Sequence, residues 1–570
     1  MSDYYIVKID IGSKQKYIFS SNRLKEIIGA SEVIRFVTEE LGKEILNKMG
    51  KSTEIFDGEN DGNILFQAGG NAMFRFDDKN DAIDFNKTFS SFVMRYFDGL
   101  ELLIVIKEFD IEKKYITDLY DEIEDLLTQK KGTRKNQFKR LSYGLTKICP
   151  NTRKPAGYIR EGRIISKESS DKLDFYNAVY EENRSKDETK EYNLKVDNKK
   201  DTQIEIENKD YMDILIEKKL IEKETINGFK FTDELDIIAG EKNEGSYIGI
   251  ACIDGNGMGQ KIENLNKSIN KGKGIYNFNL EYIEKFNDLT EEIKDNYLSA
   301  FAHTVKVIIT NYNNYCKKIN FIKEGKIIPL RPIILAGDDI TFISNGKISV
   351  EATRIFTEFI NKQKLKFGQK EYNLTTSAGV AIVKRNYPFS RAVKLANSLE
   401  KNSKNRLRKI KKCFDDVKGK DNEIEYDASL IDWQVSRGDS SSELSEISTK
   451  ELTARPYIIL NDNSKKATKV LNKLVEEEKL PQLKNIVSYN FEHFDKILNS
   501  ISNSDIKSNL KNFFRSMNSN EVDAKLFALK YGLQDKIEGG YDINTLRPVM
   551  YDAIDIVDLY VCLKGENNNE

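Results

Sequence analysis

The sequence predicts an α+β protein in which one folding unit occurs twice. Strand and helix patterns follow the order strand, helix, hairpin, helix, strand over residues 4–109 and again over residues 246–384. Each hairpin contains a tight turn, AGGN at 68–71 in the first copy and AGDD at 336–339 in the second. This order matches the split βαβ arrangement, so we expect two ferredoxin-like, mainly antiparallel sheets produced by an internal duplication.

The elements of the first copy can be assigned in order. YYIVKIDI (4–11) is rich in β-branched and aromatic residues and predicts a strand, and the long stretch that follows has helical periodicity. ILFQAGGNAMFRF (64–76) predicts two short strands around a Gly-Gly turn. A helix over 80–97 and the strand LELLIVIKEF (100–109) complete the unit.

The second copy repeats this order with longer helices. SYIGIACID (246–254) predicts a strand and residues 296–319 a helix. RPIILAGDDITFIS (331–344) predicts a hairpin, residues 349–367 a helix, and YNLTTSAGVAIVK (372–384) the last strand. The two copies differ at the hairpin tip, where the second has two adjacent aspartates.

We therefore expect four regions, of which the first and third are the two copies. Residues 1–111 form the first copy, residues 112–240 a small intervening or linker domain of less regular pattern, and residues 241–415 the second copy. Residues 416–570 form a C-terminal domain that is mostly helical, because amphipathic patterns dominate there.

Composition excludes several classes of protein. Lys and Arg number 90 against 91 Asp and Glu, so no overall basic excess indicates nucleic-acid binding. The N-terminus does not resemble a signal peptide and no run is apolar enough to span a membrane, so we expect a cytoplasmic protein without membrane contact. The five cysteines are scattered without a CxxC pair, so neither a disulfide framework nor a thiolate zinc site is expected. Two histidines are too few for an HD-type phosphohydrolase, so carboxylates and lysines are the expected catalytic groups.

The paired acids at the second hairpin suggest a metal site. Asp338 and Asp339 lie between two apolar strands, where like charges are costly unless a cation compensates them. Asp254 ends the neighbouring strand, so it is expected to approach Asp338. Because Mg²⁺ prefers carboxylate and phosphate oxygens, we expect a two-metal site for Mg²⁺ or Mn²⁺.

A glycine-rich turn follows Asp254. Gly255, Gly257 and Gly259 leave backbone amides accessible to a triphosphate. A lone GDD or GNGMG is commonly an ordinary turn, but the combination of the turn, the three acids and the flanking strands favours a nucleotide site over a purely structural feature.

The second copy resembles the palm domain of the large, polymerase-like subunit of type III CRISPR effector complexes, which is related to GGDEF diguanylate cyclases and nucleotide cyclases. The motif D-G-D-x-M-G of that family is similar to DGNGMG (254–259), and its GGDD hairpin is similar to AGDD (336–339). TSAGVAIVK (376–384) and the helix after it resemble the following segment of the family. The first copy resembles the inactive first palm, and KICPNTRKPA (147–156) resembles a small cysteine-containing segment between the palms, here with a single cysteine and no zinc expected.

The resemblance implies a metal-dependent nucleotidyltransferase or cyclase that makes cyclic or linear oligonucleotides from NTPs, with ATP the expected substrate. It implies that the three aspartates are catalytic and bind the metals. The implied nucleotide-binding residues are Gly255, Asn256, Gly257, Met258, Gly259, Gly337 and Lys404. The implied partners are the NTP substrate, RNA and other CRISPR effector subunits.

The sequence also departs from the family pattern. Asn256 replaces an acid and Ala336 replaces a glycine, and the chain starts at the first palm, so activity of an N-terminal HD nuclease domain is not expected. These departures leave two alternatives open. One is a non-catalytic nucleotide- or RNA-binding scaffold subunit, and the other is a diguanylate-type cyclase that prefers GTP.

Overall fold

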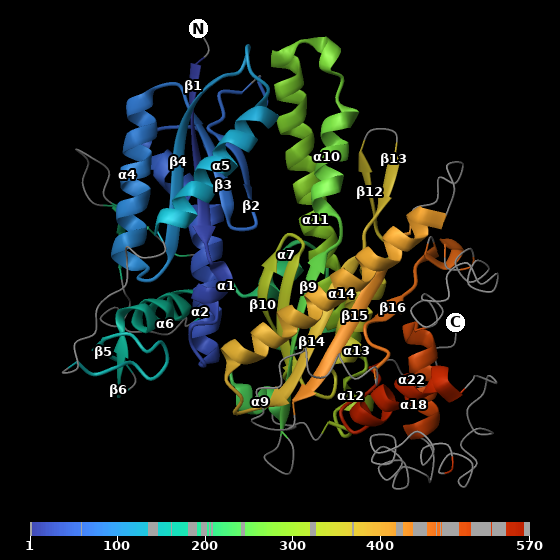
Figure 1. Cartoon of the computed structure of the whole chain (residues 1–570). Helices are drawn as coiled ribbons and strands as arrows, with labels where there is room; N and C mark the ends of the chain where they lie inside the picture. Colours follow the sequence, from blue (N-terminus) through green and yellow to red (C-terminus); the bar gives the residue numbers. More distant parts are fainter. Residues whose placement is uncertain are drawn as a thin grey trace.

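The structure is a computed structural model. Apart from a few single positions, it describes residues 3–134, 146–180, 191–194, 202–240, 246–319, 326–367, 370–417, 426–436, 453–469, 489–502, 526 and 543–563. Two main sheets with helices on their faces form the described molecule (Figure 1). Parts of the expected regions 112–240 and 416–570 lie outside the described residues.

The two sheets share one topology. The first has the strand order β2-β3-β1-β4, and the first four strands of the second have the order β10-β11-β9-β14, all antiparallel. The strands are β1 (Asp3–Gly12), β2 (Ile64–Ala68), β3 (Asn71–Phe76), β4 (Glu101–Asp110), β9 (Tyr247–Gly255), β10 (Leu330–Ala336), β11 (Asp339–Asn345) and β14 (Thr376–Lys384). The predicted duplication of a ferredoxin-like unit is thereby confirmed, and we call the units the first and second palm.

Strand register aligns the two copies residue by residue. In the first palm Asp10 of β1 lies opposite Asn71 of β3. In the second palm the antiparallel register of β9 and β11, continued by one residue, places Asp254 opposite Asp339. Asp10 is therefore the counterpart of Asp254, and Asn71 is the counterpart of Asp339.

Helices cover both faces of the first sheet. Helix α4 (Lys79–Tyr96) packs on one face, and α5 (Ile116–Arg134) packs on the other. Between β1 and β2 the chain forms α1 (Lys14–Ile18), α2 (Leu24–Arg35), the π-helical turn η1 (Phe36–Glu40) and α3 (Leu41–Met49). The packing of the first palm therefore continues beyond residue 111, where we placed its end.

The second sheet is larger than predicted. Helix α13 (Ser349–Ile360) covers one face and α14 (Phe389–Val417) covers the other. Strand β15 (Ser429–Ser436) pairs in parallel with β14, and β16 (Tyr457–Ile459) pairs with β15. The region expected to be mostly helical thus supplies two strands to the second palm, besides α18 (Phe491–Ser502) and α22 (Ile543–Ile556).

Shorter elements connect these units. They are the hairpin β5 (Ala156–Arg160) and β6 (Arg163–Ser166), α6 (Lys167–Tyr180), β7 (Tyr192–Leu194), β8 (Thr202–Ile204), α7 (Tyr211–Glu217), α8 (Lys223–Ile226), α9 (Leu235–Ala239), α10 (Met258–Ser268), η2 (Lys271–Lys273), α11 (Ile275–Thr310), α12 (Tyr312–Tyr315), β12 (Lys364–Phe367) and β13 (Lys370–Asn373).

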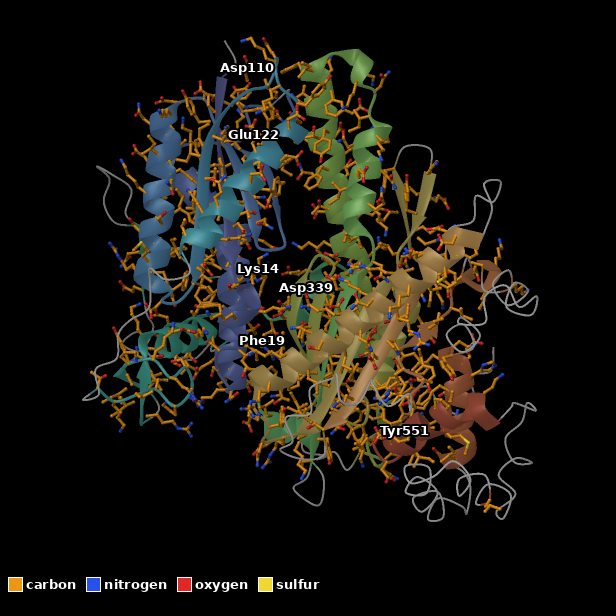
Figure 2. The ribbon with its side chains drawn as sticks, viewed as in Figure 1. Lys14, Phe19, Asp110, Glu122, Asp339 and Tyr551 are labelled. Atoms are coloured by element: carbon orange, nitrogen blue, oxygen red, sulfur yellow. The ribbon has the colours of Figure 1, made fainter. Side chains whose placement is uncertain are left out.

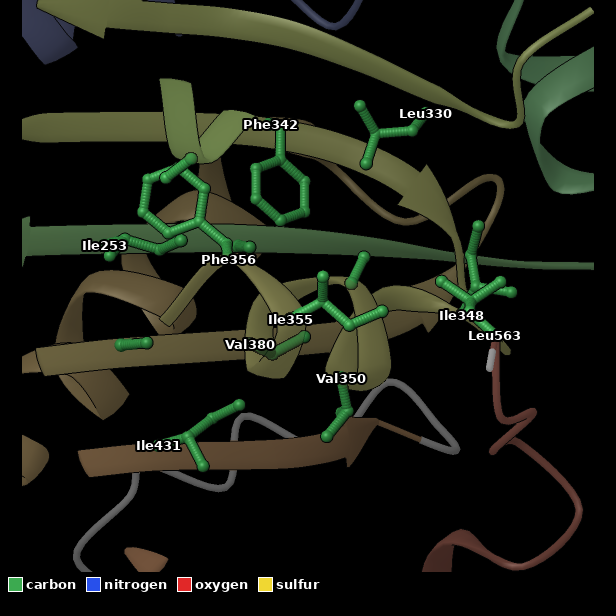
Figure 3. Packing of buried hydrophobic residues seen from close by; sticks show 14 of the residues in the cluster. Ile253, Leu330, Phe342, Ile348, Val350, Ile355, Phe356, Val380, Ile431 and Leu563 are labelled. Carbon is green, nitrogen blue, oxygen red and sulfur yellow. The ribbon is translucent and has the colours of Figure 1, made fainter. Parts of the chain in front are cut away.

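The core of the second palm lies between its sheet and α13. Figure 3 shows Phe342, Val380 and Ile431 of three strands facing Ile355 and Phe356 of the helix. These side chains are 2% exposed or less, and full burial of such a side chain contributes about 1.5–3 kcal/mol. The alternating apolar pattern of the strands therefore fixes which face each residue occupies.

Two sets of contacts hold the palms together. Helix α11 has 36 residues, about 54 Å of helix, and passes along both palms (Figure 1). Its Asn279 accepts a hydrogen bond of 2.8 Å from the Ile116 amide of the first palm. On the opposite side Phe19 of the first palm stacks on Phe389 of α14, with ring centroids 5.8 Å apart. In the described part of the chain, no helix has the length and hydropathy needed to cross a membrane.

Candidate active site

The three predicted aspartates lie at one end of the second sheet. Asp254 is the last residue but one of β9, and Asp338 and Asp339 lie at the tip of the hairpin β10–β11. Gly337 has a φ of 63°, which favours glycine, and no atom lies within 4 Å of the place where its Cβ would stand. Asp338 packs against Gly255, since a Cβ added there would lie 2.9 Å from the Asp338 Cβ. The hairpin turn is therefore closely packed on the side that faces Gly255 and open at Gly337.

The hairpin carboxyls are poorly compensated in charge. Burial raises the pKa of Asp338, and the nearby Lys261 lowers it in part. Burial and the charge of Asp338 together raise the pKa of Asp339 to about 6, against a lowering effect of Lys14. This electrostatic environment is one that a bound cation would relieve.

Asp254 is already paired with a cationic side chain. Lys404 of α14 donates a hydrogen bond to the Asp254 Oδ2, and its Nζ lies 3.1 Å from the Glu400 Oε1. Burial, and next the charge of Arg408, lower the pKa of Lys404. Lys404 was expected to contact phosphate; in this structure it pairs with Asp254 of β9 and Glu400 of α14, and its phosphate contact stays a prediction.

Close helix–sheet packing brings these α14 residues to the site. A Cβ on Gly379 of β14 would lie 2.2 Å from the Ala396 carbonyl oxygen and 2.3 Å from the Glu400 amide, so only glycine allows this approach. Ser403 adds a hydrogen bond of 2.9 Å to the Ala378 carbonyl. The glycine of the TSAGVAIVK segment therefore sets the distance from α14 to the acids.

Glu400 is a site residue that the sequence analysis missed. It is 7% exposed, and burial followed by the charge of Asp339 raises its pKa to about 7. The signal was available, because Glu400 lies one helical turn before Lys404 and so on the same face of α14. Its carboxyl adds a proton-binding group beside the three aspartates.

The glycine-rich turn is open in only part of its length. Gly255 is buried, and a Cβ there would lie 2.4 Å from the Met258 Cε and 2.7 Å from the Tyr297 hydroxyl. Gly257 has a φ of 67° and precedes α10, and Gly259 has no neighbour within 4 Å of its Cβ position. The first amides of α10 have no partner within the helix, so the accessible anion-binding positions are 257–259.

Asn256 is held inside the protein. Its side-chain Oδ1 accepts a hydrogen bond of 2.8 Å from the Ser377 hydroxyl, and its backbone N–H donates one of 2.8 Å to the Thr375 carbonyl. The Asn256 carbonyl accepts a hydrogen bond of 2.7 Å from Lys261 of α10. In the structure Asn256 positions the turn, and its nucleotide contact stays a prediction.

The first palm contributes a lysine toward the acids of the second. Figure 2 labels Lys14 of the first palm and Asp339 of the second on the facing sides of the two units. Lys14 donates a hydrogen bond to the Gly69 carbonyl, and a Cβ on Gly70 would lie 2.3 Å from the Lys14 Cε. Burial lowers the pKa of Lys14, and the charges of Asp10 and Asp339 oppose that change. The AGGN turn of the first palm therefore binds the charged Lys14 side chain at the position where the second palm has acids.

The first palm has a cationic counterpart of the acidic site. Asp10, which corresponds to Asp254, pairs with Lys131 of α5 at 2.7 Å. Lys8 is 5% exposed, and burial lowers its pKa to about 8. Sequence analysis missed Lys8, Lys14 and Lys131 because they come from three different elements, β1, α1 and α5.

The donor chemistry of the second palm suits a hard divalent cation. Carboxylates with raised pKa values and like-charged neighbours gain most from such an ion. Asp254, Asp338 and Asp339 are the groups that would hold it. In this structure no three His, Cys, Asp or Glu side chains among the described residues stand close enough together to share one metal ion, so the three aspartates would have to approach one another when a cation binds.

The fold and the acid-tipped hairpin define a palm domain. Residues 247–411 match the family model of the Cas10/Cmr2 second palm domain, and this range contains the acids, the glycine-rich turn and Lys404. Residues 247–411 are therefore similar to the Cas10/Cmr2 second palm domain, which confirms the resemblance predicted for the second copy. A search of curated proteins finds no similar sequence.

Several solved structures are similar to the chain. A Csm1–Csm4 cassette in complex with cA4 has 12% identity and a TM-score of 0.48, covering 99% of this chain and 70% of that chain. Csm1 of T. onnurineus has 11% identity and a TM-score of 0.46, covering 98% and 69%. A Csm1–Csm4 cassette in complex with one ATP has 12% identity and a TM-score of 0.46, covering 98% and 70%.

Proposed function

We propose that this protein is a metal-dependent nucleotidyltransferase that joins NTPs, ATP most readily, into linear or cyclic oligonucleotides in CRISPR-type antiviral defence. The observation that carries the proposal is the placement of Asp338 and Asp339 beside Asp254 within a Cas10/Cmr2-type palm. Their raised pKa values indicate a site built to receive positive charge.

The residues of the second palm have separate roles in this reaction. A 3′ hydroxyl attacks the α-phosphorus of an NTP, a new P–O bond forms, and the bond to pyrophosphate breaks. Asp339, as a ligand of the cation, would help to activate this hydroxyl. Glu400, with a pKa of about 7, is a nearby carboxyl group able to accept the hydroxyl proton.

Asp254, Asp338 and Asp339 would hold Mg²⁺ or Mn²⁺, whose charge would stabilise the triphosphate and its leaving group. In the structure Lys404 donates a hydrogen bond to one carboxylate oxygen of Asp254, which is then not available to a metal ion. We infer that Lys404 releases Asp254 when nucleotide and cation bind, and that it then contacts phosphate. This exchange accounts for both the predicted and the observed partner of Lys404.

Phosphate contacts come from both palms in this account. The amides of residues 257–259 lie at the start of α10, and Lys14 supplies a cation from the first palm. The glycines at 255 and 337 shape the turns that carry the acids. Two palms joined in one chain would then place two nucleotides face to face.

The proposed partners rest on the same similarity. The similar Csm1 structures were solved with Csm4, and with ATP or cyclic oligoadenylates. We infer that this chain likewise works with other CRISPR effector subunits and with RNA, in the cytoplasm.

The test is mass spectrometry of products after incubation with each NTP and Mg²⁺ or Mn²⁺, with and without candidate RNAs. We expect an oligonucleotide product from the native protein with ATP and none from the Asp338→Ala/Asp339→Ala variant. A product from GTP alone would assign a diguanylate-type activity instead. Equal product from both proteins would contradict the proposed site.

The Lys404–Asp254 ion pair favours a second candidate, a scaffold subunit that binds nucleotide without turnover. It predicts metal-dependent ATP binding with no pyrophosphate release under any condition, including added RNA. Nucleotide binding measured by calorimetry beside a pyrophosphate assay separates the two functions.

A further inference from the structure

Four side chains form a hydrogen-bonded cluster beside helix α2, in the segment that connects the two palms along the chain. They are Cys149, Thr152, Ser166 and Ser169. The Thr152 Oγ1 lies 2.8 Å from the Ser166 Oγ, and the Cys149 Sγ lies 3.7 Å from the Ser169 Oγ. Cys149, Ser166 and Ser169 are 1% exposed or less. Burial raises the pKa of the Cys149 thiol, but hydrogen bonds, those of Thr152 foremost, outweigh this effect and bring it to about 7.

Two short backbone turns bring the cluster together. The first runs from Cys149 to Lys154, where the Cys149 amide donates to the Lys154 carbonyl at 2.8 Å and the Arg153 amide donates to the Cys149 carbonyl at 2.9 Å. The second is the start of α6, where the Ser169 amide donates to the Ser166 Oγ at 3.3 Å. The hairpin β5–β6 connects the two turns.

The spacing of these residues is that of a zinc site. Each turn presents two side chains separated by two residues, as in C-x2-C…C-x2-C sites, with a hairpin between the pairs. The donors do not suit zinc, however, because structural sites use thiolates and imidazoles, whereas this cluster has one thiol and three hydroxyls. The hydroxyls are engaged with one another and with the sulfur.

The cluster is fastened to the first palm by a buried carboxylate. Ser169 donates a hydrogen bond of 2.8 Å to Glu26 of α2, and Asn151 donates one of 2.6 Å to its other oxygen. Glu26 is fully buried, so both of its oxygens need such donors. The same hydrogen bonds thus hold the two turns together and attach α6 to α2. In a zinc site the metal ion links the two turns in this way.

We propose that Cys149, Thr152, Ser166 and Ser169 form a metal-independent counterpart of a four-ligand zinc site, in which hydrogen bonds replace the metal. The geometry of the two turns remains that of a metal site. The combined substitutions Thr152→Cys, Ser166→Cys and Ser169→Cys therefore create a tetrathiolate site that takes up Zn²⁺, while the native cluster takes up none and needs none.

The experiment compares the full-length native protein with this triple variant, both loaded with Zn²⁺ and then desalted. Zinc content, the absorption of Co²⁺-substituted protein and the melting temperature with and without EDTA are measured. We expect no bound zinc and no EDTA effect for the native protein. We expect about one zinc per chain, thiolate-to-cobalt absorption and a melting temperature lowered by EDTA for the variant.

A quadruple variant that also carries Cys149→Ser is the matched control, and we expect it to retain much less zinc. The Cys149→Ser single variant keeps the proposal testable if the triple variant fails to fold. Since serine can hydrogen-bond at this position, we expect the single variant to melt within a few degrees of the native protein. The proposal is overturned by stoichiometric zinc in the native protein, by a folded triple variant without metal, or by unfolding of the single variant.

Discussion

Substitution of Gly379 by alanine should disturb both the fold and the site. The added Cβ would lie 2.2 Å from the Ala396 carbonyl oxygen and 2.3 Å from the Glu400 amide. Contacts between such atoms are comfortable only near 3.4 Å and beyond, so α14 must withdraw from β14 by about 1 Å. The helix is anchored along its length, for example by Ser403, so this movement is resisted.

The expected cost has two parts. Overpacking of this kind destabilises a core by about 1–3 kcal/mol, and the contact with rigid backbone places Gly379→Ala at the upper end. The same shift moves Glu400 and Lys404 away from Asp254, and a displacement of about 1 Å can reduce turnover by about 10²-fold. Thermal unfolding and product formation would therefore both be affected.

The assay measures melting temperature and pyrophosphate release for Gly379→Ala beside the control Gly157→Ala. Gly157 lies in β5, has no atom within 4 Å of its Cβ position and does not have a positive φ, so its substitution should change neither quantity. A Gly379→Ala protein that melts and turns over like the native one would refute the claim that this glycine sets the position of α14.

Two further predictions concern charged groups at the site. Because Lys14 supplies positive charge near Asp339, Lys14→Ala should raise the KM for NTP by about tenfold or more. Lys16 is an exposed lysine on the same helix, so Lys16→Ala should leave the KM unchanged. Steady-state kinetics of both variants test this prediction. Burial and the charge of Asp339 raise the pKa of Glu400 to about 7, whereas its value in the unfolded chain is near 4.3. Between these two pH values the folded protein binds more protons than the unfolded chain. The free energy of unfolding therefore falls as the pH rises from about 4 to 7. Glu400→Gln should remove part of this fall and melt higher than the native protein at pH 8, with little difference at pH 4.5; an equal slope in both proteins would contradict the burial argument.

The sequence was sufficient for the duplicated sheets and for the position of the acids. Strand alternation and the two hairpin turns are local signals, and the register then follows from which residues must face the core. Asp254, Asp338 and Asp339 could be brought together because one strand order places the end of β9 beside the hairpin tip.

The rest of the site depends on packing between distant segments. The charges of Lys14 and Asp339 interact only because the first palm lies against the second, and no local pattern encodes that proximity. Glu400 and Lys404 reach the acids through the close approach of α14 at Gly379. Strand β15 was not predicted as part of the palm. It pairs in parallel with β14, and parallel strands are joined by a long crossover rather than by a short turn with its own sequence signal.

The most direct test of the central claim uses the register match between the two copies. Asp339 and Asn71 occupy the same place in the two palms, so Asp339→Ala and Asn71→Ala are matched substitutions. The measurement is product formation from ATP with Mg²⁺ by the native protein and these two variants, with any activating RNA present. The account predicts that Asp339→Ala loses product by at least about 10²-fold while Asn71→Ala retains it. Equal losses in both variants, or none in either, would contradict the assignment of catalysis to the second palm.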